Sequence, residues 1–84
     1  MHVEFFGVPR ERAGVAELDV TAGTLGELVN TLAEELPSFA EFVVDSRLHP
    51  SFAANLNGDL FVSDPATPLA SGDCILILSA DAGG

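Results

Sequence analysis

The spacing of hydrophobic and polar residues changes along the chain, and each change predicts a different element. Near the start, Val3–Phe5 and Glu17–Val20 alternate with a period of two, which is typical of half-buried strands. Residues 7–14 between them are charged and bracketed by glycine, so we expect a hairpin with a long loop. This loop carries Arg10 and Arg12, two of the three arginines of the chain.

Helical spacing follows over one continuous segment. Thr24 and Glu27 have the spacing of a capping box, in which two side chains satisfy free N–H groups of the first helical turn. Pro37 then ends a run of apolar residues at helical intervals, namely Leu25, Leu28, Val29, Leu32, Ala33 and Leu36. We therefore predict one amphipathic helix of about three turns. The next segment, 37–48, is compatible with a short second helix that packs three residues on the core: Phe39, Phe42 and Val43.

Strands return in the second half of the chain. Phe52–Leu56 and Leu60–Val62 flank Asn57-Gly58, a pair favoured in tight hairpins because both turn positions need a positive φ. A turn-rich segment then leads to Cys74–Leu78, whose apolar run lacks polar alternation, as in a central strand. This order of elements predicts an α+β fold of the ubiquitin-like β-grasp type. In that fold a mixed ββαββ sheet packs on one main helix, and the last strand lies beside the first.

The length of 84 residues allows one domain, 1–84, with a single core. The apolar runs fall far short of the roughly 20 residues that a membrane span requires. The first residues also lack the basic flank and cleavage site of a secretory signal. We therefore expect a soluble cytoplasmic protein that does not bind membranes.

Charge narrows the range of partners. Thirteen acidic residues stand against three arginines and no lysine, for a formal net charge of −10. Phosphate binding needs clustered lysine or arginine, so this balance argues against a nucleic-acid partner. The negative charge suits a basic protein partner, or it serves solubility alone. Because lysine is absent, the chain has no side-chain amine on which an isopeptide bond could form.

Candidate catalytic side chains are few. His2 lies at an N-terminus that we expect to fray, and neither His2 nor His49 has the spacing of a metal or nucleophile motif, so we expect surface histidines and no metal site. The single cysteine, Cys74, excludes an internal disulfide and cysteine-rich metal sites, and we expect it to pack as a small hydrophobe. Phe6 and Phe61 are expected in the core, with docking of partners as the alternative. The sequence thus predicts no catalytic centre.

The sequence ends in six small residues, Ser79–Gly84, directly after the predicted central strand. Two terminal glycines arise by chance in about one chain in 200 at average glycine use. We expect a flexible tail over 79–84, which would reach roughly 17–20 Å and carry a carboxylate at its tip. Gly83 and Gly84 lack Cβ atoms and would fit a narrow channel in a partner. A frayed, inert tail is the alternative.

Several segments together resemble the sulfur-carrier proteins of the MoaD/ThiS family, which includes the small subunit of molybdopterin synthase and the thiamine-thiazole sulfur carrier. The resemblance spans nearly the whole chain, and the order of the segments together with the final Gly-Gly makes it fairly specific. The opening segment and the helix start fit the molybdopterin-type members well. The matching segments are Val3–Gly7, Arg12–Gly14, Thr24–Leu28, Leu56–Gly58, Pro68-Leu69, Gly72–Leu78 and Ala82–Gly84.

This resemblance implies a mechanism. A partner similar to ubiquitin-activating enzymes would use ATP and Mg²⁺ to convert the carboxylate of Gly84 into an acyl-adenylate. Sulfur from a persulfide or sulfide source would then displace AMP and leave a thiocarboxylate, with Gly83 giving access to the reacting carbonyl. That group would donate sulfur in a second partner, such as the large subunit of molybdopterin synthase. The chain itself would be a non-catalytic carrier without a bound cofactor, or the small subunit of such a synthase.

Other acceptors and classes stay open. Ser79–Ala82 replaces the bulky or proline residues that many molybdopterin-type members carry before the two glycines. Thiamine thiazole, cysteine or another thio-metabolite is therefore an alternative destination for the sulfur. A ubiquitin-like modifier, in which a lysine of a target protein attacks the activated Gly84, is a second class. A β-grasp interaction module with an inert tail is a third.

Overall fold

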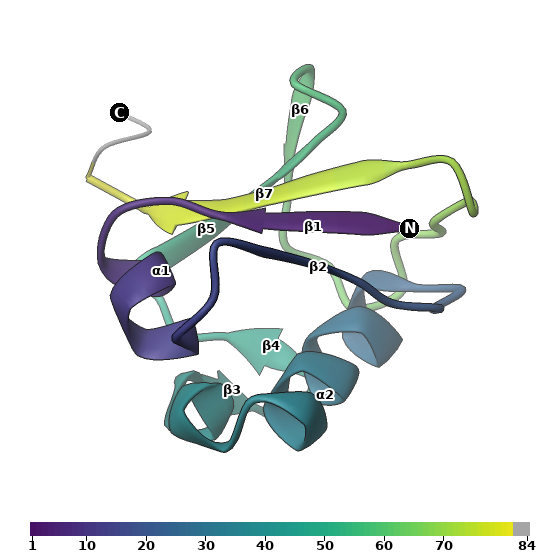
Figure 1. Ribbon diagram of the computed structural model, residues 1–84. Coiled ribbons are helices and arrows are strands. Elements are labelled where there is room, and N and C mark those ends of the chain that lie inside the picture. Colours follow the sequence, from purple (N-terminus) through teal and green to yellow (C-terminus); the bar gives the residue numbers. More distant parts are fainter. Residues whose placement is uncertain (82–84) are drawn as a thin grey trace.

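A five-stranded mixed sheet in the order β2-β1-β7-β5-β6 forms the framework of the computed structural model, which describes residues 1–81 (Figure 1). A separate two-stranded sheet joins β3 and β4. The elements are β1 (His2–Phe5), α1 (Val8–Ala13), β2 (Glu17–Asp19), α2 (Leu25–Glu35), the 3₁₀ helix η1 (Pro37–Phe42), β3 (Val43–Val44), β4 (Arg47–Leu48), β5 (Phe52–Leu56), β6 (Leu60–Val62) and β7 (Cys74–Ser79).

The last strand, β7, occupies the centre of the sheet. It runs parallel to β1, with Phe5 opposite Ile77, and antiparallel to β5, with Ala54 opposite Ile77. Strands β2 and β6 pair antiparallel with β1 and β5 and form the two edges. The prediction that the final strand lies centrally beside the first is therefore confirmed.

Helix α2 begins and ends as its sequence predicts. The Glu27 N–H group donates to Thr24 Oγ1 at 3.2 Å, and the Thr24 hydroxyl donates to Glu27 Oε2 at 3.3 Å. The N–H groups of Leu25 and Gly26, which lack partners within the helix, donate to carbonyls of Thr67 and Pro65 at 2.9 Å. The start of α2 is thereby bound to the segment that leads into β7.

The predicted long loop over 7–14 is wrong, because these residues contain helix α1. Gly7 and Gly14 both adopt positive φ, at 67° and 78°, and they stand just before and just after the helix. The Gly14 N–H group donates to the Arg10 carbonyl at 3.0 Å, which is a left-handed helix C-cap. Pro9 fits the first turn, where its missing N–H group is not needed.

The segment 37–48 is only partly as expected. Pro37–Phe42 forms the short helix, although of the 3₁₀ type, and Phe39 is fully buried. The following hairpin between β3 and β4 was not predicted. Asp45 and Ser46 make its turn with positive φ values of 53° and 61°, in positions for which glycine or asparagine would be the usual signal.

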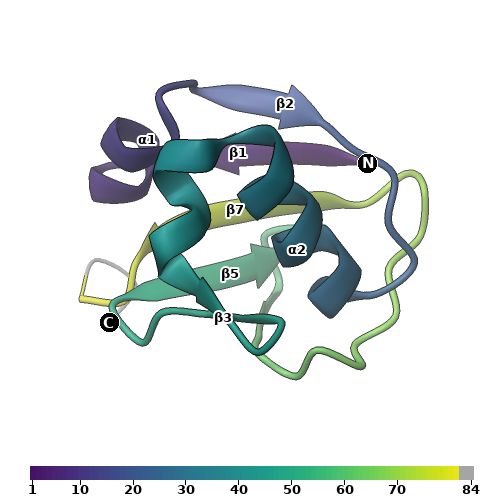
Figure 2. The same cartoon turned by 90° about the horizontal axis from the view of Figure 1, so that it is seen from below.

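The core lies between one face of the sheet and α2 with η1. Figure 2 shows α2 crossing this face. Phe39 is at its centre, with ring centroids 5.5 Å from Phe5 in an edge-on contact and 5.8 Å from the stacked ring of Phe52. The other buried apolar residues are Val3, Pro9, Ala13, Val20, Leu25, Leu28, Val29, Leu32, Ala54, Ile75 and Ile77. No helix within residues 1–81 is long and apolar enough to cross a bilayer.

Candidate functional site: the end of β7 and the open face of the sheet

The backbone is held in place up to the residue after β7. Ser79 pairs with Phe52 as the last residue of the strand, and the Ala80 N–H group donates to the Ser51 carbonyl at 2.8 Å. Ser79 therefore belongs to the strand, one residue beyond the predicted end at Leu78. The predicted site residues Gly83 and Gly84 lie outside the described residues and follow Asp81 by only two and three positions.

The start of β7 is fixed by a polar network around Asn57. The Asn57 side chain donates to Asp73 Oδ1 at 3.0 Å and accepts from the Cys74 N–H group at 2.8 Å. Asp73 also accepts from the Ala70 N–H group at 2.7 Å, and this bond, followed by that from Asn57, lowers the pKa of Asp73. Asn57 and Gly58 adopt positive φ as predicted, 55° and 74°. The predicted turn thus also positions the central strand.

The face of the sheet opposite the helices carries an apolar surface. Because side chains alternate along a strand, Leu76 and Leu78 of β7 point away from the core that contains Ile75 and Ile77. Ala53 pairs with Leu78, and Asn55 pairs with both Leu76 and Phe61. Phe6 follows β1 and bonds through its N–H group to the Ile77 carbonyl at 2.9 Å. We call this surface the open-face patch, and its residues are Phe6, Ala53, Asn55, Phe61, Leu76 and Leu78.

The predicted core positions of Phe6 and Phe61 are wrong. Phe6 is 63% exposed and Phe61 is 52% exposed. The reason is the strand alternation, which turns Phe5 inward and Phe6 outward, and pairs Phe61 with the outward-facing Asn55. Docking of a partner on these rings, the alternative drawn from the sequence, stays a prediction.

A polar atom lies within the open-face patch. Asn55 Oδ1 is buried and accepts no hydrogen bond from any of the described residues 1–81. Buried polar atoms are normally hydrogen-bonded, because the loss of water is otherwise uncompensated. A partner that covers the patch and supplies an N–H or O–H group would satisfy this oxygen.

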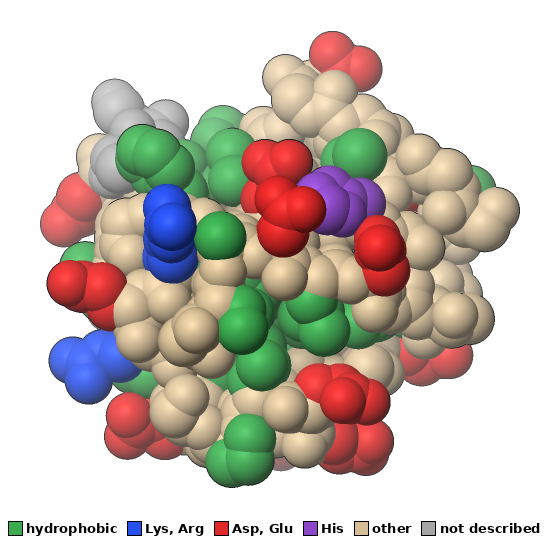
Figure 3. Space-filling view, in the orientation of Figure 1, with side chains coloured by type: hydrophobic (Ala, Val, Ile, Leu, Met, Phe, Trp, Pro, Cys, Tyr) green, Lys and Arg blue, Asp and Glu red, His purple; other side chains and the backbone are tan. Residues whose placement is uncertain are grey.

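Charge is unevenly placed around the sheet. Figure 3 shows two arginine side chains at the side of the molecule where α1 lies, whereas acidic side chains are spread over the whole of this view, including beside the arginines. Among residues 1–81, every ion pair involves His2, which contacts Glu4, Glu17 and Asp19. The hydrogen bond to Asp19 is the main cause that raises the pKa of His2. His2 is thus an ordered residue of β1, and the expected fraying at this position is wrong.

The other predicted residues have structural roles. His49 is exposed between β4 and β5, as expected, and its Nδ1 accepts from the Ser51 N–H group at 3.0 Å. Cys74 is exposed, so its expected role as a packed hydrophobe is wrong. Its N–H bond to Asn57 holds the start of β7 while its side chain faces solvent.

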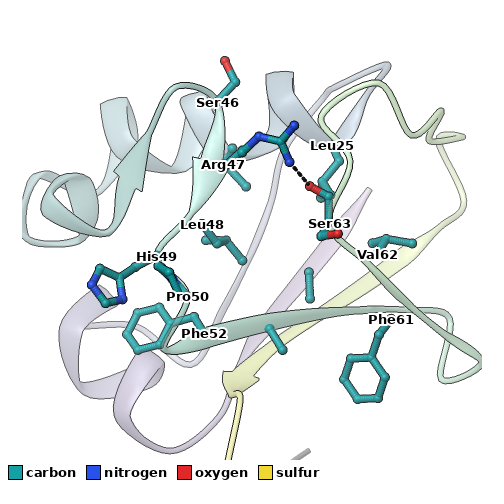
Figure 4. A pocket seen from close by; sticks show the side chains of 13 residues that line it. Leu25, Ser46, Arg47, Leu48, His49, Pro50, Phe52, Phe61, Val62 and Ser63 are labelled. Atoms are coloured by element: carbon teal, nitrogen blue, oxygen red, sulfur yellow. Dashed lines mark hydrogen bonds between the residues drawn. The ribbon is translucent and has the colours of Figure 1, made fainter.

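A groove of about 340 Å³ lies at the edge of the sheet between β4 and the hairpin of β5 and β6 (Figure 4). Leu25, Leu48 and Val62 contribute apolar walls. Arg47 stands at its margin and donates through Nη1 to the Ser63 carbonyl at 3.4 Å. The sequence contains no motif that would have indicated this groove, because its walls come from four separate segments.

The fold and the anchored terminal strand define a ubiquitin-like β-grasp protein. The chain belongs to the ThiS family, whose model matches residues 3–84 and therefore includes the final two glycines. This is a family of small sulfur-carrier and ubiquitin-like modifier proteins.

Solved structures agree with this fold. The small archaeal modifier protein 1 of Methanosarcina acetivorans has a TM-score of 0.78 and 23% identity, over 99% of this chain and 94% of that one. A chain of the BexX/CysO complex of Amycolatopsis orientalis has a TM-score of 0.77 and 23% identity, over 99% of this chain and 98% of that one. A Pyrococcus furiosus protein provisionally described as molybdopterin converting factor, subunit 1, has a TM-score of 0.71 and 23% identity, over 93% of each chain. No curated protein matches the chain.

Proposed function

We propose that this protein is a sulfur carrier whose C-terminal carboxylate is converted to a thiocarboxylate. The observation that supports the proposal is the match of the family model to residues 3–84, which includes Gly83 and Gly84, and the backbone before them is hydrogen-bonded to the sheet as far as Ala80. No catalytic side-chain arrangement was predicted from the sequence, so the reactive group in this proposal is the Gly84 carboxylate, and the catalytic side chains belong to partners.

The chemistry proceeds in two balanced steps. A partner enzyme of the ubiquitin-activating type transfers AMP from ATP to the Gly84 carboxylate, with Mg²⁺ in the partner's site, and releases pyrophosphate. Sulfide then attacks the acyl carbon and expels AMP, which leaves one oxygen replaced by sulfur. When a persulfide attacks instead, the product is an acyl disulfide, and a thiol reductant must cleave its S–S bond to release the same thiocarboxylate. Gly83 lets the partner's backbone approach closely, because it has no side chain.

The open-face patch is the surface on which we place the activating partner. It lies on the central strand that leads directly to the terminus, and it exposes two phenylalanine rings of the kind that dominate interfaces. The unsatisfied Asn55 Oδ1 offers a hydrogen-bond acceptor within the same surface. The net charge of −10 favours a partner with a basic rim.

Delivery of sulfur to a molybdopterin synthase large subunit is the acceptor we favour, with this chain as the small subunit. The sequence resemblance of the opening segment and the helix start supports it, and so does the fold shared with the Pyrococcus furiosus protein. Thiamine thiazole, cysteine or another thio-metabolite is the alternative acceptor. Ser79–Ala82, which differs from the bulky or proline residues that many molybdopterin-type members carry before the two glycines, supports this alternative.

A mass measurement tests the proposal. The full chain is incubated with ATP, Mg²⁺, a sulfide source and a ubiquitin-activating-like enzyme encoded in the same genome, and its intact mass is recorded. We expect a species in which one oxygen is replaced by sulfur. A chain that lacks Gly83 and Gly84 should stay unmodified with an unchanged melting temperature, whereas Gly72→Ala should be modified like the parent, since a Cβ at Gly72 meets no atom within 4 Å. Persistent absence of the sulfur-containing mass overturns the proposal.

Conjugation to proteins is the second candidate function, favoured by the fold shared with the small archaeal modifier proteins. In this case a target lysine attacks the activated Gly84 and forms an isopeptide bond. Because this chain contains no lysine, its own side chains offer no attachment point for such a bond. Gly-Gly remnants on lysines of other proteins after proteolysis would identify this activity, and they would be absent for the chain without Gly83 and Gly84.

A further inference from the structure

Four polar side chains form a compact group on the open face of the hairpin of β1 and β2. His2 and Glu4 are two residues apart in β1, and Glu17 and Asp19 are two residues apart in β2, so each pair shares a face. The register places His2 opposite Asp19 and Glu4 opposite Glu17. All four therefore project from the same side, and Figure 3 shows a histidine with acidic side chains beside it.

The two ring nitrogens of His2 face different partners. Nδ1 lies 3.1 Å from Asp19 Oδ1, and Nε2 lies 3.3 Å from Glu4 Oε1 and 3.9 Å from Glu17 Oε1. In the neutral ring, the Nδ1–H group donates to Asp19 and the lone pair of Nε2 points toward two carboxylates. A lone pair and two negative oxygens repel one another, so either a proton on Nε2 or a metal ion between these atoms stabilises the arrangement.

One donor distance already has the value expected around a small divalent cation, and the third ligand atom, Glu17 Oε1, lies 3.9 Å from His2 Nε2 on an exposed side chain that can move closer. In a tetrahedral zinc site with bonds of about 2.0–2.1 Å, neighbouring donor atoms lie about 3.3 Å apart. The distance from His2 Nε2 to Glu4 Oε1 has this value, and one ligand atom from each of His2, Glu4 and Glu17 lies within 4.8 Å of the others. An imidazole with two carboxylates suits Zn²⁺, whereas Ca²⁺ and Mg²⁺ prefer sites made of oxygen atoms only.

Asp19 supplies the contact that metal-binding histidines usually have. A histidine ligand commonly donates its other ring N–H group to a carboxylate, which fixes the ring orientation and makes the ligating nitrogen more basic. No arginine forms an ion pair with Glu4, Glu17 or Asp19 within residues 1–81. The negative charge of the group is therefore left for His2 and a bound cation to balance.

We infer that His2, Glu4 and Glu17 form a zinc-binding site on the open face of the sheet, with Asp19 as the positioning residue. The remaining coordination position is open to water or to a ligand from a docked protein. Glu4 pairs with Leu76 of the open-face patch, so the site borders the surface proposed above for partners. It requires neither the terminal glycines nor sulfur chemistry and goes beyond the proposed function.

Titration of the full chain with Zn²⁺ alone tests this site. Histidine ring signals are followed by NMR while calorimetry records the stoichiometry. We expect one equivalent of Zn²⁺ to shift the His2 ring signals in a saturable way, with the His49 signals unmoved. The same concentration of Mg²⁺ should leave His2 unchanged. A shift of His49 alone, a shift that does not saturate, or an equal response to Mg²⁺ overturns the inference.

Matched variants separate coordination from bulk charge. His2→Gln should abolish binding, and Glu17→Gln should weaken it at least tenfold. Glu34→Gln removes the same charge from an exposed position on α2 and should leave the affinity unchanged. Asp19→Asn should weaken binding by about tenfold while His2 still responds, as expected for a residue that positions a ligand. Equal losses of Zn²⁺ affinity in Glu17→Gln and Glu34→Gln would show that the net negative charge alone attracts the ion, and this result would overturn the inference. Melting temperatures confirm that each variant is folded.

Discussion

The two faces of the sheet use the same kinds of side chain for different purposes. On the face covered by the helices, Phe39 of η1 packs against the sheet with no exposed surface, whereas Phe61 of β6 on the opposite face leaves 52% of its surface in solvent. Alternation along β7 divides the run Ile75–Leu78 in the same way, with isoleucines inward and leucines outward. Whether an apolar strand residue of this protein is packed in the core or exposed to solvent therefore depends on its parity along the strand, and composition does not distinguish the two.

Truncation of the two phenylalanines should separate the faces most clearly. Phe39→Ala removes a ring that contacts Phe5, Phe42 and Phe52, and we expect it to lower the free energy of unfolding by about 3–5 kcal/mol. Phe61→Ala should change it by no more than about 0.5 kcal/mol, because much of this ring is already exposed. Chemical denaturation measures both. Similar losses in the two variants would contradict the division into a packed face and an open face.

A glycine in α2 tests how tightly the helix is held over the packed face. A Cβ atom at Gly26 would lie 3.0 Å from Pro65 Cβ and 3.2 Å from the Pro65 carbonyl oxygen. Overpacking of this kind costs about 1–3 kcal/mol, and the better helix propensity of alanine offsets up to about 1 kcal/mol of it. We expect Gly26→Ala to destabilise the protein by about 1 kcal/mol in thermal or urea unfolding.

Gly72→Ala is the matched control for this substitution. Gly72 precedes β7 outside any helix, and an added Cβ meets no atom within 4 Å. The free energy of unfolding should therefore stay within about 0.5 kcal/mol of the parent value. If Gly26→Ala proved as neutral as Gly72→Ala, the close approach between α2 and the segment before β7 would be disproved.

Substitutions in the open-face patch should weaken binding to the activating partner although they change the free energy of unfolding very little. Phe6→Ser and Phe61→Ser each remove one exposed ring of the open-face patch. We expect each substitution to weaken binding of this protein to the activating partner by about tenfold, which corresponds to about 1.4 kcal/mol. The Michaelis constant for this protein in the adenylation reaction, measured by pyrophosphate release, reports the change. Val44→Ser, at a residue 64% exposed in β3, is the control for loss of an exposed apolar side chain. An equal effect of all three variants would count against a defined docking surface.

The features that the sequence predicted correctly are those that depend on a few neighbouring residues. The alternation of Val3–Phe5 and the capping pair Thr24 and Glu27 are contained within a few residues, and the corresponding strand and helix are present. Helix α1 was missed altogether, because glycines at both ends of a segment are as compatible with a short capped helix as with a loop. The alternation that indicates a strand at Val3–Phe5 also turns Phe6 outward. The prediction of Phe6 in the core followed from its apolar side chain and not from its position in this alternation.

The group around His2 depended on information that no single segment holds. Glu17 and Asp19 lie on one face of their strand, as the alternation of β2 indicates. Their approach to His2 depends on the register between β1 and β2, which is set by the long connection through α1. The groove beside β4 likewise depends on segments that are distant in the sequence. The turn at Asn57 was predicted, but the hydrogen bonds of its side chain to Asp73 and Cys74 were not, because they join residues 16 and 17 positions apart.

The smallest expected effect concerns the polar network that holds the start of β7. The pKa of Asp73 lies below its ordinary value of 3.8, first because of the Ala70 N–H group and second because of the Asn57 side chain. A carboxyl group whose pKa is lowered by folding contributes stability above its unfolded pKa, and this contribution is lost as the pH falls through the folded value. Between pH 5 and pH 2, at intervals of about 0.5 pH units, the melting temperature of Asp73→Asn should therefore fall less steeply than that of the parent protein. Glu34→Gln, which removes an exposed carboxyl group from α2, should retain the parent slope. Because Asp73 lies in the loop before the central strand, parallel curves for Asp73→Asn and the parent would mean that the turn at Asn57 holds β7 without help from this carboxylate.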